Sequence, residues 1–146
     1  MRWFFIEIEK LNIFIDKLKN SYIVFTPTTK EPNYTKETDY SYDRLRQGQP
    51  LTFNPYRAVE PLKLFFTSPK EEVATYFGEQ DSITGLEKTI IFGVKSCDLA
   101  AHRVQDFVFL EGTEVDSLYR LRRENTILVS GDCTDFKEIC HCLVWD

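Results

Sequence analysis

The chain lacks any long hydrophobic run, which argues against a membrane span. No apolar stretch of its 146 residues approaches the roughly 20 that a helix needs to cross a bilayer. The N-terminal segment MRWFFIEIEK contains two glutamates and has no small-residue cleavage pattern, so we do not expect a signal peptide. These features predict a cytoplasmic protein.

Clustered charge and nucleotide-binding motifs are also missing. The chain has 18 Lys and Arg against 23 Asp and Glu, a net charge of -5, and no basic run stands out. Nucleic acid and anionic membrane surfaces are therefore poor candidate partners. The glycines are too scattered for a dinucleotide fingerprint. There is no phosphate loop, Ser–His–Asp set or useful pair of carboxylates, so no catalytic residue is predicted.

What is present suffices for a hydrophobic core. The apolar fraction is 42%, with twelve Phe, seven Tyr and two Trp, which argues against disorder. The length fits one domain, residues 1–146, that buries about 70% of its unfolded surface.

Strand and helix patterns alternate along the chain, which is typical of an α/β protein. Periodicity predicts strands at 2–9, 22–27 (closed by Pro27), 60–66, 87–95 and 126–131. It predicts helices at 9–21, 69–77, 96–110 and 113–125. The expected fold is a mixed sheet with flanking helices. It includes a parallel strand-helix-helix-strand crossover at 89–131.

Two of these helices have specific local signals. Ser68 can cap the helix at 69–77, and Pro69 suits its first position. The helix that begins near Ser96 is expected to turn its apolar side chains inward. These are Leu99, Ala100, Val104, Phe107 and Val108.

Cysteine is scarce but clustered. Three of the four cysteines, Cys133, Cys140 and Cys142, lie close to the end of the chain, and the fourth is Cys97. Cys97 and Cys133 each follow a strand of the predicted crossover. If those strands are parallel, both cysteines lie at the sheet edge where α/β proteins hold ligands. Cys140 and Cys142 need only fold back through a short loop.

Four converging thiolates fit a tetrahedral zinc ion or an iron–sulfur cluster. Cys97 at a helix start would bring backbone N–H groups and the positive dipole end near a negatively charged cluster. The spacing matches neither the paired C-x2-C motifs of a zinc ribbon nor a ferredoxin run. A redox dithiol remains open, as does an interpretation in which Cys97 is a buried hydrophobe and the other cysteines are incidental.

Four further residues could tune such a site. His141, between two candidate ligands, could hydrogen-bond to the bound group, replace a ligand, or be an exposed loop residue. Asp98 is expected to complement the helix dipole. Arg122 and Arg123 could act on the site's charge, but we favour salt bridges at a helix C-terminus.

Two segments, IIFGVKSCDLAAHRVQDFVFL (90–110) and DSLYRLRRENTILVSGDCTDFKEICHC (116–142), resemble the N-terminal part of the hydrogenase beta-subunit family. This family includes the beta subunit of cytosolic sulfhydrogenases and one of the subunits of anaerobic sulfite reductase. Its blocks G-V-R-P-C-D, Y-x-x-R-R-E-N-T, N-C-x-x-P and C-F-C have counterparts here in the same order, the last two through Cys133, Cys140 and Cys142. The departures include Lys95 for Arg, Ser96 for Pro and His141 for Phe.

The resemblance implies an electron-transfer subunit that is not catalytic alone. It implies that Cys97, Cys133, Cys140 and Cys142 ligate one [4Fe-4S] cluster. It also implies partner subunits with a nickel–iron or sirohaem centre and a flavin reductase component. Family chains continue past C-x-C, so residues 1–146 are expected to correspond to the N-terminal region of a longer family chain. A zinc-stapled interaction module and a metal-free assembly domain are the alternatives.

Overall fold

A four-stranded mixed sheet forms the centre of the protein. The computed structural model describes residues 3–30, 39–68, 86–138, 140 and 142. The strands are β1 (Ile23–Lys30), β2 (Asp39–Arg44), β3 (Thr89–Val94) and β4 (Thr126–Ser130), in the order β2-β1-β3-β4. β1 pairs antiparallel with β2, whereas β1–β3 and β3–β4 are parallel. The predicted α/β class is confirmed.

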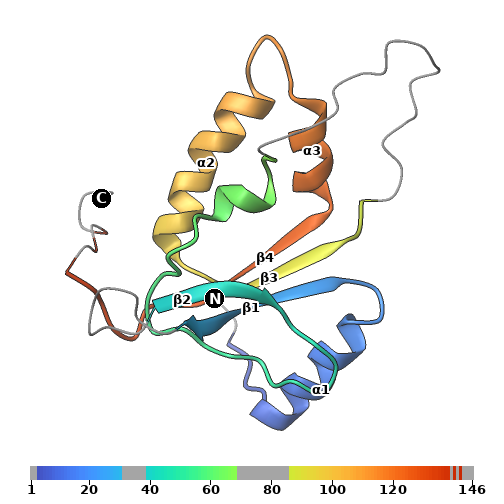
Figure 1. The fold of residues 1–146 in the computed structure, drawn as a ribbon, viewed down its shortest axis with the longest axis vertical. Helices are drawn as coiled ribbons and strands as arrows, with labels where there is room; N and C mark the ends of the chain where they lie inside the picture. Colours follow the sequence, from blue (N-terminus) through green and yellow to red (C-terminus); the bar gives the residue numbers. More distant parts are fainter. Residues whose placement is uncertain (1–2, 31–38, 69–85, 139, 141, 143–146) are drawn as a thin grey trace.

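Helices cover both faces of this sheet (Figure 1). They are α1 (Ile8–Leu18), the short 3-10 helix η1 (Leu62–Phe65), α2 (Ser96–Leu110) and α3 (Ser117–Glu124). α1 lies on one face, and the other three lie on the opposite face (Figure 1). Neighbouring residues of β3 pack into different hydrophobic cores, because successive side chains of a strand point to opposite faces of the sheet. Ile90 packs on the α1 side, whereas Ile91 packs with residues of η1 and α3.

The predicted parallel crossover is confirmed. β3, α2, α3 and β4 follow one another, and the register pairs Thr89 with Thr126 and Ile91 with Leu128. The side chain of Asp116 caps α3 by accepting the backbone N–H of Tyr119 at 2.9 Å. This arrangement sends the C-terminal ends of β3 and β4 to the same edge of the sheet.

A glycine bulge shapes the end of β3. Gly93 has φ +76°, and the β3–β4 register shifts between Phe92 and Val94. A Cβ atom at position 93 would lie 2.5 Å from both Pro27 Cγ and Asn54 Oδ1. Backbone conformation and lack of space therefore both require glycine immediately before the turn into α2.

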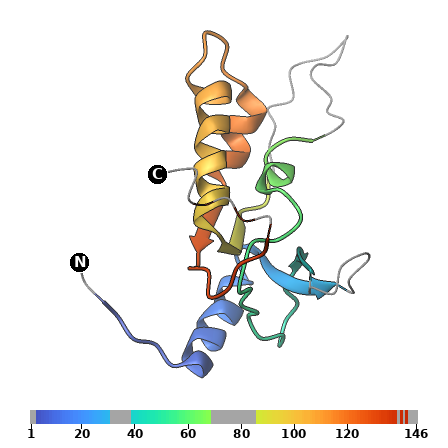
Figure 2. The ribbon, with the colours of Figure 1, turned by 90° about the vertical axis from the view of Figure 1, so that its left-hand side faces the viewer.

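The strand predicted at 2–9 is wrong. The sheet includes no strand from this segment, and α1 begins at Ile8. Trp3, Phe4 and Phe5 are 84%, 89% and 92% exposed, since they contact neither core. An alternating pattern yields a strand only where a sheet edge accepts it, and here the segment projects from the body (Figure 2).

Two further strand predictions need correction. Residues 60–66 contain η1 instead of a strand, because Leu62 and Phe66 bury their side chains in the core beneath α2 and α3. β1 is not closed by Pro27 but continues to Lys30. Its pairing with β3 ends at Phe25, so the missing N–H of Pro27 interrupts no bond in that ladder.

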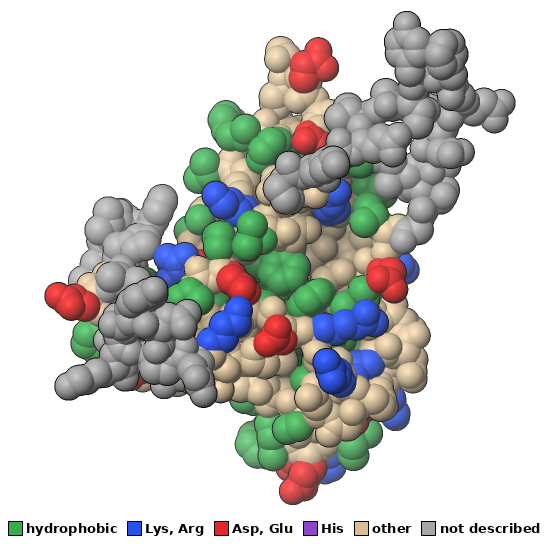
Figure 3. Space-filling model, viewed as in Figure 1, with side chains coloured by type: hydrophobic (Ala, Val, Ile, Leu, Met, Phe, Trp, Pro, Cys, Tyr) green, Lys and Arg blue, Asp and Glu red, His purple; other side chains and the backbone are tan. Residues whose placement is uncertain are grey.

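Three apolar side chains of α2 that were expected to face inward face outward instead. Val104, Phe107 and Val108 are 55%, 64% and 56% exposed, whereas Leu99 packs partly against the core. Hydrophobic side chains accordingly reach the surface over α2 (Figure 3).

The two fully buried residues of α2 are polar. Asp98 and His102 are 7% and 3% exposed. The His102 ring packs on Phe66 with centroids 4.3 Å apart, and its Nδ1 lies 3.0 Å from Gln105 Oε1. Burial lowers the pKa of His102, so the ring stays neutral at pH 7 and packs as a polar core residue.

The helix predicted at 69–77 lies outside the described residues. Among the helices that the structure does describe, none is both long and apolar enough to span a bilayer.

Replacing Gly93 with alanine should lower the free energy of unfolding by about 3 kcal/mol. The cost combines a left-handed conformation with the overpacking of Pro27 and Asn54. The control is Gly48→Ala, because Gly48 has φ +74° but nothing within 4 Å of an added Cβ. It should cost only about 1 kcal/mol. Urea denaturation measures both, and equal losses would contradict the packing argument.

Candidate metal centre

Cys97 and Cys133 lie at the same edge of the sheet. Cys97 is the second residue of α2, directly after β3, and Cys133 follows the end of β4. The N–H of Gly131 donates to the carbonyl of Val94 at 3.0 Å, so the chain leaving β4 runs beside the end of β3. Figure 2 shows this segment, in red, passing the first turn of α2. The prediction that both cysteines lie at this edge of the sheet is confirmed.

The remaining two cysteines share this electrostatic environment. Burial raises the pKa of the Cys97 thiol, and the charges of Asp98 and Cys142 raise it further. Burial also raises the pKa of Cys133, with Cys142 and Cys140 adding to the shift. Cys142 thus acts on both sulfurs, although Cys97 is far from it in the sequence. Cys97 and Cys140 are half-buried, whereas Cys133 and Cys142 are exposed.

The backbone before Cys140 already donates to sulfur. The N–H of Lys137 lies 3.2 Å from Cys140 Sγ, and the N–H of Cys140 donates to the Lys137 carbonyl at 2.9 Å. Hydrogen bonds to ligand sulfurs stabilise thiolates and tune the potential of iron–sulfur centres. This turn is therefore suited to hold a ligating thiolate.

The loop with Cys133 and Cys140, residues 131–140, is held by protein contacts; we call it the cysteine loop. The Lys137 ammonium lies 2.6 Å from Asp39 Oδ1 at the start of β2 and 4.7 Å from the centre of the Tyr56 ring. The N–H groups of Thr134 and Asp135 donate to the Pro55 carbonyl at 2.9 and 3.2 Å. The loop therefore packs against the start of β2 and the 54–56 segment.

A second lysine joins three segments beneath the loop. Lys95 is 2% exposed, and its Nζ donates to the carbonyls of Asn54 at 2.7 Å and Asp132 at 2.9 Å. The Asn54 side-chain amide donates in turn to the carbonyl of Gly93 at 3.1 Å. Lys95 thus fixes the residue before Cys133 relative to the end of β3.

The donor set fits a thiophilic metal, but the four sulfurs do not stand at ligating positions. Among the described residues, no three His, Cys, Asp or Glu side chains surround a common point that could hold a metal ion. Four thiols suit zinc or an iron–sulfur cluster, and the N–H of Lys137 already donates to Cys140 Sγ. The ligation predicted for Cys97, Cys133, Cys140 and Cys142 stays a prediction.

The residues considered for tuning the site differ in position. Asp98 lies beside Cys97, where its Oδ1 pairs with Arg57 at 3.3 Å. His141 lies outside the described residues. The guanidinium of Arg123 pairs with Asp106 at 3.2 Å, and that of Arg122 donates to the Phe66 carbonyl at 3.2 Å.

The two arginines lie at the far end of β4 from the cysteines. α3, which contains them, leads into the start of β4, whereas Cys133 follows its end. The structural interpretation favoured from the sequence is confirmed for the Arg123 ion pair.

Sequence reasoning missed four residues that shape the site, namely Asp39, Arg57, Lys95 and Lys137. A lysine at the end of a buried strand was the one available signal, since lysine is almost never fully buried without a partner. The other three act through contacts between distant segments, which no local pattern encodes.

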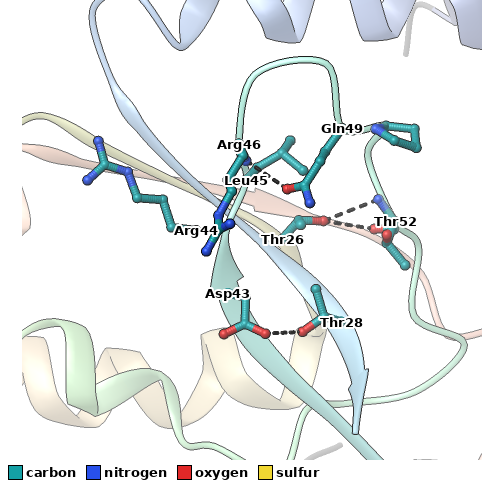
Figure 4. A pocket seen from close by; sticks show the side chains of 9 residues that line it. Thr26, Thr28, Asp43, Arg44, Leu45, Arg46, Gln49 and Thr52 are labelled. Carbon is teal, nitrogen blue, oxygen red and sulfur yellow. Dashed lines mark hydrogen bonds between the residues drawn. The ribbon is translucent and has the colours of Figure 1, made fainter.

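A pocket of about 610 Å³ lies elsewhere, between the β1–β2 pair and the loop that follows β2 (Figure 4). Its polar groups largely satisfy one another. The Thr26 hydroxyl exchanges hydrogen bonds with the backbone of Thr52, and Thr28 bonds to Asp43. No cysteine lines the pocket, and it is not our candidate site.

These features define an α/β protein with a candidate four-cysteine centre at the carboxyl edge of a parallel crossover. Among known proteins, the chain is similar to sulfhydrogenase 2 subunit beta from Pyrococcus furiosus, with 29% identity over 143 residues. The match covers 97% of this chain but only 40% of that protein. It confirms the resemblance to hydrogenase beta subunits. No protein-family model and no solved structure matched the chain.

The raised pKa values predict slow alkylation of Cys97 and Cys133 at neutral pH. Because the thiolate reacts, half-maximal iodoacetamide labelling of both should occur at higher pH in the folded chain than in urea. Mass spectrometry of metal-free protein resolves each site. Identical pH profiles in the folded and unfolded chain would contradict the raised pKa values of Cys97 and Cys133.

Proposed function

We propose that the chain is an electron-transfer domain or subunit that binds one [4Fe-4S] cluster through Cys97, Cys133, Cys140 and Cys142. It would relay electrons within a hydrogenase- or reductase-type complex. The similar protein is named as a subunit of a sulfhydrogenase, and this chain spans 40% of its length. The family resemblance supplies the same four-cysteine ligand set.

One observation carries the proposal. The parallel β3–β4 pair places Cys97 and Cys133 at the same sheet edge, and the N–H of Gly131 donates to the carbonyl of Val94 there. Cysteines far apart in sequence thus share one edge, at the start of a helix whose dipole favours negative charge.

The exposure of the site suits electron relay. Cys133 and Cys142 are exposed, so a partner could approach the bound group closely from that side. A bound [4Fe-4S] cluster would accept and release single electrons. The chain's own part is to supply thiolates, the N–H donor of Lys137 and a partly buried environment.

The partners proposed are redox subunits that hold the catalytic centre. On the face viewed in Figure 3, acidic and basic side chains are interspersed, without the single-sign field that nucleic acid would need. Protein partners that exchange electrons suit this surface better. We propose that the chain itself transforms no substrate and acts in the cytoplasm.

A zinc staple is the second candidate, and the loop contacts weigh against it. The cysteine loop is attached by Lys137, by two backbone bonds to Pro55 and by Lys95. A structural zinc ion is most valuable where the protein offers few other contacts. With these anchors in place, a redox role explains four cysteines better than a staple or a metal-free assembly domain does.

Protein purified without oxygen should contain about four irons and four acid-labile sulfides per chain. Iron, sulfide and zinc assays measure this directly. Stoichiometric zinc without iron in anaerobic material would refute the cluster. Anaerobic handling is essential, because an exposed cluster can be lost in air and replaced by zinc.

Replacing Cys97 with serine should abolish iron binding while leaving the fold intact. Ser96→Ala is the matched control, because Ser96 is the exposed neighbour at the start of the same helix. It should retain the iron content of the wild type. Unchanged iron content in the Cys97 variant would break the four-cysteine assignment while leaving a site in the cysteine loop possible.

A further inference from the structure

The structure buries one positive charge beside the cysteines without an acidic partner. Lys95 is 2% exposed, yet its hydrogen-bond partners are two neutral carbonyls, those of Asn54 and Asp132. Among the described residues, no carboxylate lies within ion-pair distance of its Nζ. Asp98 lies nearby in the chain, but it forms an ion pair with Arg57.

Such a charge is expensive to bury. An ammonium that leaves water loses several kcal/mol of solvation unless an opposite charge compensates it. Two carbonyls use two of its three N–H donors and supply only dipoles. The other buried lysine of the site, Lys137, has the Asp39 carboxylate at 2.6 Å. Lys95 has no such carboxylate partner among the described residues.

The nearest candidate for the missing negative charge is the cysteine site. A Cβ atom built on Gly131, two residues before Cys133, would lie 3.9 Å from Lys95 Nζ. Nζ also bonds to the carbonyl of Asp132, the residue directly before Cys133. Four thiolates with a metal ion or cluster carry net negative charge. Neutral thiols would leave Lys95 uncompensated.

We propose that Lys95 is the internal counter-ion of the group bound by the four cysteines, and that its charge raises the reduction potential of that group. This inference rests on the proposed function, because it assumes a cysteine-bound redox centre. Reduction adds one negative charge to the cluster. A fixed cation in a low-dielectric position stabilises that added charge and therefore favours the reduced form.

Lys95→Met tests the charge, since it removes the ammonium but keeps an unbranched side chain of similar length. Lys95→Arg is the matched control that keeps the charge. After anaerobic reconstitution, a redox titration followed by electron paramagnetic resonance gives each midpoint potential. In the Met variant the oxidised-to-reduced ratio at a fixed potential should rise about tenfold, which equals about 59 mV for one electron. The Arg variant should remain close to the wild type.

The outcomes separate this inference from the proposed function. If the Met variant binds wild-type amounts of iron at an unchanged potential, the counter-ion is refuted while the cluster stands. If the wild type binds zinc instead, the cluster fails. The Met variant should then bind zinc about tenfold more weakly, and equal affinity would refute the counter-ion. A wild type that binds neither metal contradicts both proposals.

The inference can still be tested if Lys95→Met does not fold. Lys95→Gln keeps N–H donors for the carbonyls of Asn54 and Asp132 but removes the charge. It carries the same expected shift if the Met variant does not fold. A wild-type potential in the Gln variant would assign Lys95 to loop attachment alone.

Discussion

The parallel pairing of β3 with β4 is the constraint on which the rest of the molecule depends. It requires a crossover over one face of the sheet, and α2 and α3 provide that crossover. It also directs both strand ends to one edge, and Cys97 and Cys133 both follow strands that end there. The bulge at Gly93 then lets Pro27 and Asn54 approach closely, and the Asn54 carbonyl accepts a hydrogen bond from Lys95. One pairing thus arranges the core and the candidate site together.

The sheet edge is held mainly by polar interactions between distant segments. Lys137 pairs with Asp39, Lys95 bridges Asn54 and Asp132, and Arg57 pairs with Asp98. Hydrogen bonds and ion pairs are directional, so they fix loop positions more sharply than apolar contacts do. These contacts hold the loops of this edge in defined positions, although they require charged groups to be buried. Such fixed loops suit a site that has to position several ligands.

Much of the crossover could be predicted from sequence, because its strands are continuous apolar runs and its helices have clear local signals. The convergence of Cys97 and Cys133 followed from that topology alone. The segment 2–9 alternates like a strand but finds no partner in the sheet, and partner choice is not a local property. The predicted orientation of α2 was wrong because the analysis of its apolar pattern assumes that the apolar side of a helix faces the core. Here Asp98 and His102 are buried instead, with Arg57 and Phe66 supplied by other segments.

The split of the candidate ligands across the crossover has a consequence for the order of maturation. Three thiols lie in one local stretch of chain, but the fourth must be brought in by closing a loop through α2 and α3. The entropy of closing that loop is offset by strand pairing and core burial, not by the metal. The four candidate ligands therefore share one edge only after the sheet has formed. If they bind the proposed cluster, folding of the crossover precedes completion of its ligand set.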